Sequence, residues 1–301
     1  EANGRRYRRR VRSTPQEVFG ERRENDLSTA RIVKIRSGKY FAEIDGEVTE
    51  CTAKGSLKIK ADGIVTGDFV TVENGVITGV MPRKNRLYRP NVANVDVVAI
   101  VVGSPPVPDF YLIDKLISVC FLSGTEVVIV VNKLDIDGEI AKKIVENYMD
   151  AVKKIFQVSA KTGDGLNEFS EYVKGKLVVL TGQSAVGKTS VLNKFFGHDG
   201  RVGELSEKTK RGKQTTTVSE IVNGGGAKLM DTPGFTSLEI NVKAEDLPES
   251  YPEFMPYLGK CRFTDCKHLK EPDCVIKQAA NDGKINKERY LRYTEIYKEA
   301  K

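Results

Sequence analysis

The sequence predicts a multidomain α/β protein: a small N-terminal β-barrel, a doubly wound α/β domain and a mostly helical C-terminal domain. Three observations favour this fold class. With 301 residues, 40% of them hydrophobic, the chain is long enough to form more than one core. Residues 30–80 show short alternating strands broken by turn residues, which is typical of a small barrel. From residue 94, apolar runs alternate with helical patterns, as in a parallel sheet covered by helices.

We place the domain boundaries where the pattern changes: a basic tail at 1–28, the barrel at 29–85, the α/β domain at 86–240 and the C-terminal domain at 241–301. The tail contains RRYRRRVR at 5–12 and has too few apolar residues to fold alone, so we expect it to be mobile. Two interpretations stay open: a solvated tail, or an arm that contacts RNA, where Tyr7 would stack on a base.

The barrel segment has glycine turns at hairpin spacing, the strongest being Asp45-Gly46, Asp62-Gly63 and Asn74-Gly75. Both of its parts, ARIVKIRSGKYFAEIDGEVTEC and SLKIKADGIVTGDFVTVENGVITGV, are predicted to be strands. An OB-like barrel of five strands fits this length, and such barrels present a basic, aromatic face to oligonucleotides. The residues that would form this face, or else only solvate and pack a barrel that positions other domains, are Lys34, Arg36, Lys39, Tyr40 and Phe41.

The segment GQSAVGKTS has the pattern GxxxxGK[ST] of a phosphate-binding loop, between an apolar strand, LVVLT, and a helical pattern. In such a loop backbone N–H groups surround the phosphates, Lys188 neutralises the β and γ oxygens, and the Thr189 hydroxyl ligates Mg²⁺. The candidate residues are Gly182, Gln183, Ser184, Ala185, Val186, Gly187, Lys188, Thr189 and Ser190.

The segment DTPG follows the apolar run KLM, so Asp231 stands at the carboxyl end of a strand, where open α/β sheets bind ligands. Asp231 suits Mg²⁺ through water, and the Gly234 N–H suits a γ-phosphate. Before it, KTKRGKQTTTVSE is similar to a switch segment. We choose Thr216 as its Mg²⁺ ligand and, with Lys188, as a catalytic residue; Thr215 and Thr217 are alternatives, and the run could instead begin an ordinary strand.

Two segments predict specificity for guanine. NKLD, which is Asn132, Lys133, Leu134 and Asp135, directly follows the strand EVVIVV. Its Asp can accept hydrogen bonds from N1 and the exocyclic amine of guanine, which adenine cannot offer, while the Lys133 stem lies over the base. After KIFQV, the triplet Ser159, Ala160 and Lys161 offers a backbone N–H to the guanine oxygen.

A third cluster lies near the C-terminus, with the spacing Cys261-x4-Cys266-x-His268-x5-Cys274. Three Cys and one His can close a tetrahedral zinc site with no open position, so we expect one structural Zn²⁺ per chain. The alternative, reduced cysteines packed as small hydrophobes, is disfavoured by the polar residues between them. His198 is predicted to be a surface residue. The neighbouring cations, which either face RNA or form a solvated rim, are Lys260, Arg262, Lys267 and Lys270.

The order NKLD, SAK, phosphate loop, Thr run, DTPG is a circular permutation of the usual GTPase order. With the barrel and the Cys/His cluster, the chain from about Ala30 resembles the RsgA (YjeQ) family of ribosome-associated GTPases. That resemblance implies GTP hydrolysis stimulated by the small ribosomal subunit during its late maturation, with contacts to rRNA. Family members often carry a His soon after DxPG, but FTSLEI has none, so we transfer no catalytic His. Phe235 replaces the water-orienting Gln of Ras-like proteins, which predicts slow intrinsic turnover.

The composition limits the kinds of partner and compartment that we expect. A net charge of +7 and a pI near 9.0 favour a polyanion. No apolar run approaches a membrane span, no secretory signal is visible, and five cysteines suit a reducing compartment, so we expect a cytoplasmic protein. The expected partners are GTP or GDP and the small ribosomal subunit with its rRNA, bound by a monomer without a membrane.

Other function classes remain as alternatives. The first is a GTP-regulated RNA-binding module without a role in ribosome assembly. An ATP-dependent enzyme would not need NKLD. A peripheral membrane GTPase is disfavoured because residues 1–28 lack an amphipathic apolar face.

The permutation frees the chain after DTPG to enter the C-terminal domain. We therefore hypothesise that ordering of DTPG by the γ-phosphate repositions that domain.

Overall fold

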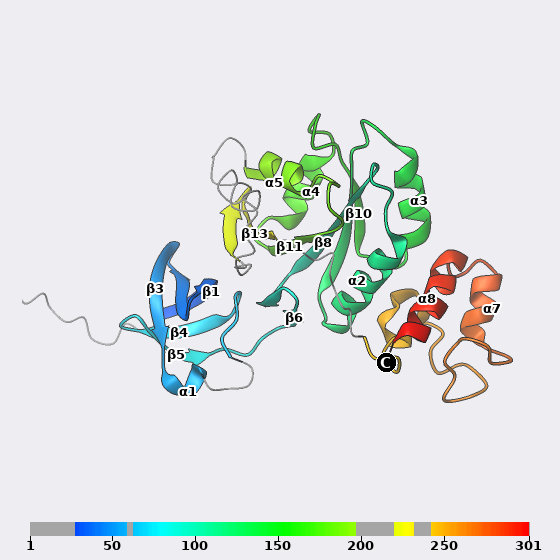
Figure 1. The fold of residues 1–301 in the computed structure, drawn as a ribbon, viewed down its shortest axis with the longest axis horizontal. Helices are drawn as coiled ribbons and strands as arrows, with labels where there is room; N and C mark the ends of the chain where they lie inside the picture. Colours follow the sequence, from blue (N-terminus) through cyan, green and yellow to red (C-terminus); the bar gives the residue numbers. More distant parts are fainter. Residues whose placement is uncertain (1–27, 59–62, 197–219, 232–241, 301) are drawn as a thin grey trace, which may run out of the picture.

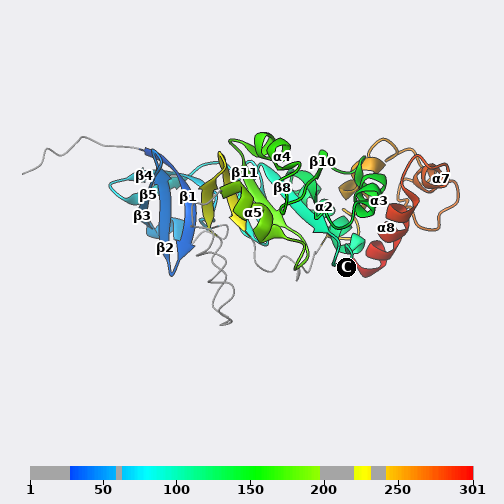
Figure 2. The ribbon, with the colours of Figure 1, turned by 90° about the horizontal axis from the view of Figure 1, so that it is seen from above.

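The computed structural model describes residues 28–58, 63–196, 220–231 and 242–300. The barrel lies at one end, the α/β domain in the middle and the C-terminal domain at the other end, an order that both Figure 1 and Figure 2 show. The nucleotide motifs therefore lie on the central domain, with one accessory domain on each side of it.

Five strands close the N-terminal barrel, in the order β1-β2-β3-β5-β4. The prediction of a five-stranded barrel is thus confirmed. Asp45-Gly46 and Asn74-Gly75 form tight turns, and all four residues have a positive φ, as hairpins with a matching twist require. The strands are β1 (Ser28–Arg36), β2 (Lys39–Ile44), β3 (Glu47–Ala53), β4 (Phe69–Glu73) and β5 (Val76–Val80).

One predicted strand is wrong. The alternation in SLKIK predicts a strand, but residues 55–58 form the short helix α1 (Gly55–Lys58), whose Leu57 is buried with the barrel core. A few alternating residues fit a single helical turn as well as a strand, so their pattern could not distinguish the two. Asp62, from the third predicted turn pair, lies outside the described residues.

The α/β domain has a six-stranded sheet in the order β10-β9-β8-β11-β13-β12, parallel except for β12. Helices α2 and α3 supply residues to the core on one face, and α4 and α5 to the core on the other, so the predicted doubly wound sheet is confirmed. The strands are β8 (Val97–Gly103), β9 (Glu126–Asn132), β10 (Lys154–Gln157), β11 (Leu177–Thr181), β12 (Ile221–Gly224) and β13 (Ala227–Asp231). The helices are α2 (Phe110–Leu122), α3 (Glu139–Tyr148), α4 (Leu166–Val173) and α5 (Lys188–Phe196).

The strand order shows what the permutation does. From β8 in the middle of the sheet, the chain builds outward to β9 and β10. It then crosses back through α4 to β11, which pairs with β8, and continues to β12 and β13 on the other side. Because β9, β10, β11 and β13 are parallel, their carboxyl ends meet at one edge whichever half comes first in the chain.

The barrel is attached to the sheet on the β12–β13 side. Lys34 and Glu220 form an ion pair at 2.6 Å, and Glu43 pairs with Lys228 and accepts a hydrogen bond from Asn223 at 2.9 Å. A small hairpin of β6 (Arg86–Tyr88) and β7 (Asn91–Ala93) connects the two domains. Polar contacts thus join the barrel to the β12–β13 side of the sheet, and the hairpin leads from the barrel into β8.

The C-terminal domain has its own core, built around Tyr251, Phe254, Ile276 and Tyr293. The helical pattern NKERYLRYTEIYKEA is confirmed as α8, which packs against α2 of the central domain. Its elements are the 3-10 turns η2 (Pro248–Ser250) and η3 (Pro252–Phe254) and the helices α7 (Val275–Asn281) and α8 (Lys287–Glu299). Across the described parts of the chain, no helix is long and apolar enough to cross a membrane.

Candidate functional site

The predicted nucleotide motifs gather at the carboxyl edge of the central sheet. NKLD begins with the last residue of β9, the loop GQSAVGKT follows β11, and Asp231 is the last residue of β13. SAK follows β10 after a single residue. Four segments that are up to a hundred residues apart in the chain therefore come together at one edge.

The loop between β11 and α5 depends on its two motif glycines. Gly182 has φ +131°, and a Cβ there would lie 2.1 Å from the Val101 carbonyl oxygen. Gly187 has φ +93°, and its Cβ would lie 2.3 Å from the Asn132 amide nitrogen. Any side chain at either position would push the loop off the neighbouring strand ends, so the close packing of this edge requires glycine.

Lys188 and Thr189 begin α5, at the end of the helix where backbone N–H groups are unpaired. The Lys188 Nζ donates to the carbonyls of Gly182 at 2.7 Å and Gln183 at 2.5 Å, which places the ammonium beside the loop. The Thr189 side chain is exposed. A cation beside the unpaired N–H groups of a helix N-terminus is suited to a polyphosphate, and the exposed hydroxyl can reach a metal ion bound to that polyphosphate.

Asn132 links three of the motifs. Its amide nitrogen donates to the Val186 carbonyl at 3.0 Å, and its amide oxygen accepts from the Ala160 N–H at 2.9 Å. The side chain is 2% exposed, so these bonds are shielded from water. Asn132 thus ties the phosphate loop and the SAK segment to the end of β9, a supporting role that sequence reasoning missed.

Lys133 crosses from NKLD to the phosphate loop. Its backbone has φ +69°, and its Nζ donates to the carbonyls of Ala185 at 2.7 Å and Pro105 at 2.5 Å. The Lys133 stem therefore lies between NKLD and the phosphate loop. The sequence prediction places this stem over a base. Leu134 donates its backbone N–H to the Val158 carbonyl, which keeps NKLD beside the end of β10.

The Asp135 carboxylate is oriented by Ser159 and Lys161. The Ser159 hydroxyl donates to one of its carboxylate oxygens at 2.7 Å, and the Lys161 ammonium lies 3.7 Å from the other. The Ser159 hydrogen bond, together with the charge of Lys161, lowers the pKa of Asp135. An ionised carboxylate in this position can accept two hydrogen bonds, as recognition of the guanine edge requires.

A loop that the sequence analysis did not single out completes this edge. Residues 104–109 connect β8 to α2, and Pro105 accepts from Lys133. The Gln183 side chain accepts from the Asp109 backbone N–H at 2.9 Å and donates to the Val107 carbonyl at 3.4 Å. The one available signal was Asp109 before a helical pattern, since its carboxylate caps α2 through the Leu112 N–H.

Part of the predicted site lies outside the described residues: Thr216 with its alternatives Thr215 and Thr217, Gly234 and Phe235. His198, the predicted surface residue, also lies outside them. The backbone of Asp231 is in register with Leu180 of β11, which places it one strand away from the phosphate loop. Of the predicted Mg²⁺ ligands, Thr189 thus lies in the first turn of α5, and Asp231 ends β13, the strand beside β11.

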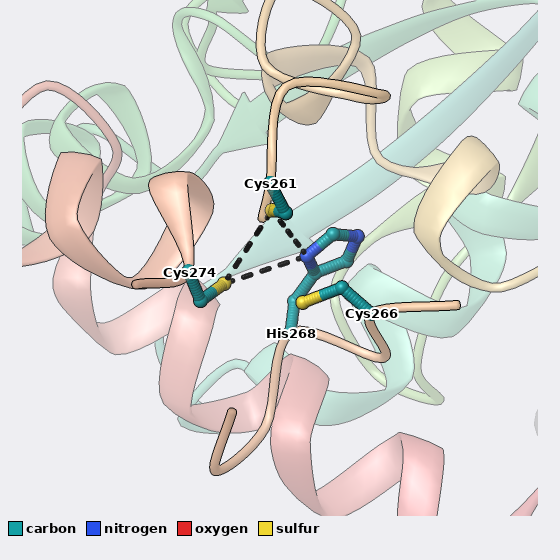
Figure 3. A group of neighbouring side chains, drawn as sticks. All are labelled: Cys261, Cys266, His268 and Cys274. Carbon is teal, nitrogen blue, oxygen red and sulfur yellow. Dashed lines mark hydrogen bonds between the residues drawn. The ribbon is translucent and has the colours of Figure 1, made fainter. Parts of the chain in front are cut away.

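The Cys/His cluster forms a compact group in the C-terminal domain (Figure 3). One ligand atom each from Cys261, Cys266, His268 and Cys274 lies within 4.8 Å of all the others. The His268 Nδ1 is 3.5 Å from the sulfurs of Cys261 and Cys274, which are 4.0 Å apart. The four donors converge on one point and can hold a metal ion.

The surrounding residues hold this group in place. Tyr290 and Tyr293 of α8 donate their hydroxyls to the carbonyls of His268 at 3.0 Å and Lys267 at 2.7 Å. Burial lowers the pKa of His268, so its ring is neutral, as a metal ligand must be. Burial raises the pKa of Cys266 to about 12, so a bound cation is needed to keep this thiolate at neutral pH.

Comparison with known proteins agrees with the geometry. The sequence profile of the RsgA GTPase family matches residues 80–241. Two proteins named small ribosomal subunit biogenesis GTPase RsgA are similar along most of their length. The one from Caldanaerobacter subterraneus is 37% identical over 90% of this chain and 95% of its own. The one from Thermotoga maritima is 38% identical over 89% of this chain and 95% of its own.

Two solved structures are also similar. The crystal structure of YjeQ from Thermotoga maritima has a TM-score of 0.79 and 33% identity, covering 91% of this chain and 98% of that one. The structure described as YloQ, a circularly permuted GTPase, has a TM-score of 0.74 and 26% identity, covering 95% of this chain and 97% of that one. The likeness therefore extends over the barrel, the central sheet and the C-terminal domain.

Proposed function

The chain belongs to the RsgA GTPase family, and from this premise we propose that it hydrolyses GTP to GDP and phosphate during late maturation of the small ribosomal subunit. We further propose that it binds this subunit through rRNA. The relatives' names support the first proposal. The observation that carries the nucleotide assignment is Asn132, which joins the base-reading and phosphate-reading loops by two buried hydrogen bonds.

We assign the guanine edge to Asp135 and the guanine oxygen to the backbone of the SAK segment. Ser159 supports this assignment, because its hydroxyl occupies one lone pair of Asp135 and leaves the carboxylate ionised and oriented. Adenine has no N–H donor at either of the two ring positions where guanine has its N1–H and exocyclic amine, so the same carboxylate would reject it. The site therefore selects GTP over ATP by the fixed position of one side chain.

We assign the phosphates to residues 182–190, with Lys188 stabilising charge on the β and γ oxygens. Mg²⁺ bound with the nucleotide would be held by Thr189, Thr216 and Asp231, and would supply further positive charge there. Thr216 and Gly234 enter this proposal from the sequence alone. Because Phe235 cannot orient water, we expect the isolated chain to turn over slowly until the subunit rearranges the site.

We propose that the metal of the C-terminal cluster is Zn²⁺, one per chain. With Zn–S near 2.3 Å and Zn–N near 2.05 Å, tetrahedral geometry puts sulfurs about 3.8 Å apart and S and N about 3.6 Å apart. The separations of 4.0 and 3.5 Å among Cys261, His268 and Cys274 agree with these values, and all four ligand atoms lie within 4.8 Å of one another. Three thiolates and one imidazole leave no open position, so the ion would stabilise the ligand loop rather than catalyse.

The net charge of +7 supports binding to an rRNA surface. We keep the domain division 1–28, 29–85, 86–240 and 241–301 as part of this proposal, with a monomer as the acting form. A factor that acts on small ribosomal subunits works where they are assembled, so we place the chain in the cytoplasm.

GTP turnover measured with and without purified small ribosomal subunits tests the proposal, with large subunits as the control. We expect slow turnover alone and a large increase only with small subunits. The second candidate, a GTP-regulated RNA-binding module outside ribosome assembly, predicts equal rates in all three reactions together with tight binding of unrelated RNA.

A further inference from the structure

A buried ionic cluster joins the C-terminal domain to α2. Arg289 of α8 is 1% exposed and donates to Asp114 of α2 at 2.7 Å. The same guanidinium donates to both oxygens of Glu253, at 2.5 and 3.2 Å. Asp114 is fully buried, so its charge is compatible with folding only while these partners surround it.

The cluster also bonds α8 to both α2 and α3. Arg292 donates to the second oxygen of Asp114 at 2.5 Å and to the Asn147 side chain of α3 at 3.0 Å. The rings of Tyr148 and Tyr251 lie 5.0 and 4.9 Å from the Arg289 guanidinium. A displacement of α8 would therefore have to move α2 or break several buried charge-assisted bonds at once.

Helix α8 also contacts the metal-binding loop. Tyr290 and Tyr293, which bond the carbonyls of His268 and Lys267, lie on the same helix as Arg289. One helix thus contacts both the ligand loop and α2.

The N-terminus of α2 contacts the phosphate loop. Asp109 caps the helix with its carboxylate and donates its backbone N–H to the Gln183 side chain at 2.9 Å. Asp109 precedes Asp114 by five residues, about 7.5 Å along a helix axis, so the cluster and the cap belong to one rigid unit.

Gln183 in turn contacts Lys188. The backbone carbonyl of Gln183 accepts the Lys188 ammonium at 2.5 Å, while its side chain is held by Asp109 and Val107. The position of the Gln183 carbonyl, and with it the preferred position of the ammonium, therefore depends on where α2 begins.

We propose that Gln183 is a positioning residue for Lys188, and that Asp114 and Arg289 determine its position through α2. The inference rests on the proposed function only in giving Lys188 the phosphates as ligands. These contacts connect the C-terminal domain to the phosphate loop through α2, without involving DTPG.

A double-mutant cycle on affinity for fluorescent GDP tests this route, because two residues that act through one another have non-additive effects. Arg289→Lys keeps the charge but cannot bond both carboxylates, and we expect it to weaken GDP binding by about threefold to tenfold. In a Gln183→Ala background, Arg289→Lys should have less than about a twofold effect. Asp114→Asn, which keeps the size of the side chain, should behave in the same way and serves if Arg289→Lys does not fold.

The matched control is Glu299→Ala, which removes an exposed contact of Lys115 and Tyr111 between the same two helices. It should leave GDP affinity unchanged in both backgrounds. Metal content and thermal unfolding establish that each variant is folded. The proposal would be overturned if Arg289→Lys weakened GDP binding by the same factor in the native and Gln183→Ala backgrounds. It would also be overturned if Arg289→Lys and Asp114→Asn both folded and left GDP affinity unchanged. The double-mutant cycle needs no ribosomal subunit, so its outcome is independent of whether subunits stimulate GTP turnover.

Discussion

The Asn132 side chain donates a hydrogen bond to the Val186 backbone carbonyl at 3.0 Å, across 54 residues of chain. The end of β9 thus holds the loop between β11 and α5 directly. In a permuted chain this contact does not depend on which of the two segments is made first.

Asn132→Ala should therefore weaken binding of both base and phosphate. It leaves the Val186 carbonyl and the Ala160 N–H without their buried partner, and each such loss costs about 1–3 kcal/mol. We expect GDP affinity to fall by about tenfold to a hundredfold in a titration with fluorescent GDP. Asn223→Ala, which removes an exposed Asn bonded to Glu43, is the control and should leave affinity unchanged. Native affinity in Asn132→Ala would show that the loops hold their positions without it.

Asp135→Asn should change base preference. The amide offers a donor where guanine presents its exocyclic amine, so GTP affinity should fall while affinity for xanthosine triphosphate, which has an oxygen there, should rise. Competition between the two nucleotides measures the change. Unaltered preference for GTP would reject Asp135 as the residue that reads the base.

Lys188→Ala should reduce turnover by more than about a hundredfold, because charge developing on the β and γ oxygens loses its nearest fixed cation. Subunit-stimulated hydrolysis is the appropriate measurement, since its higher rate leaves a wide range for the loss. Lys194→Ala, on the same helix, is the control for removing a positive charge. Hydrolysis close to normal in Lys188→Ala would move the active site elsewhere.

Gly187→Ala should damage the phosphate loop beyond the strain of its positive φ. The added methyl would lie 2.3 Å from the Asn132 amide, so the loop or the end of β9 must shift. We expect loss of GDP binding. Gly175 also has a positive φ, +74°, but nothing lies within 4 Å of its Cβ position. Gly175→Ala should cost about 1 kcal/mol of stability and leave GDP affinity intact. Equal GDP affinity in the two variants would argue against the contact.

Cys266→Ser, or stringent chelation, should release the metal and disorder the ligand loop, because metal binding supplies folding free energy that a polar segment lacks. The central domain has its own cores, so GDP should still bind, within about tenfold of native affinity. Binding to small subunits and stimulated hydrolysis should fall together. Atomic analysis that finds no zinc in native protein would remove the metal assignment; full stimulation in Cys266→Ser would exclude the loop from subunit sensing.

Local patterns predicted much of this protein. A phosphate loop is a strand, a glycine-rich turn and a helix in direct succession, and NKLD, SAK and DTPG each follow an apolar strand. Hairpin turns such as Asn74-Gly75 are equally local, since two residues determine the backbone path. The same locality explains the error at SLKIK, where too few residues carried the pattern.

The ligand cluster was predictable for a similar reason. Cys261 and Cys274 are 13 residues apart, and short loops bring such donors together without help from the rest of the fold.

The sequence by itself thus determined the fold class and the motifs, because each of these depends on residues that are close in the chain. Only the tertiary structure decided that Asn132 supports two loops, that Gln183 meets Asp109 across 74 residues, and that Arg289 meets Asp114 across 175. The Gln183 and Arg289 contacts exist because α2 packs between the sheet and α8, and the Asn132 contacts exist because the ends of β9, β10 and β11 meet at one edge of the sheet. Such packing depends on how whole surfaces fit together, which no pattern of neighbouring residues records.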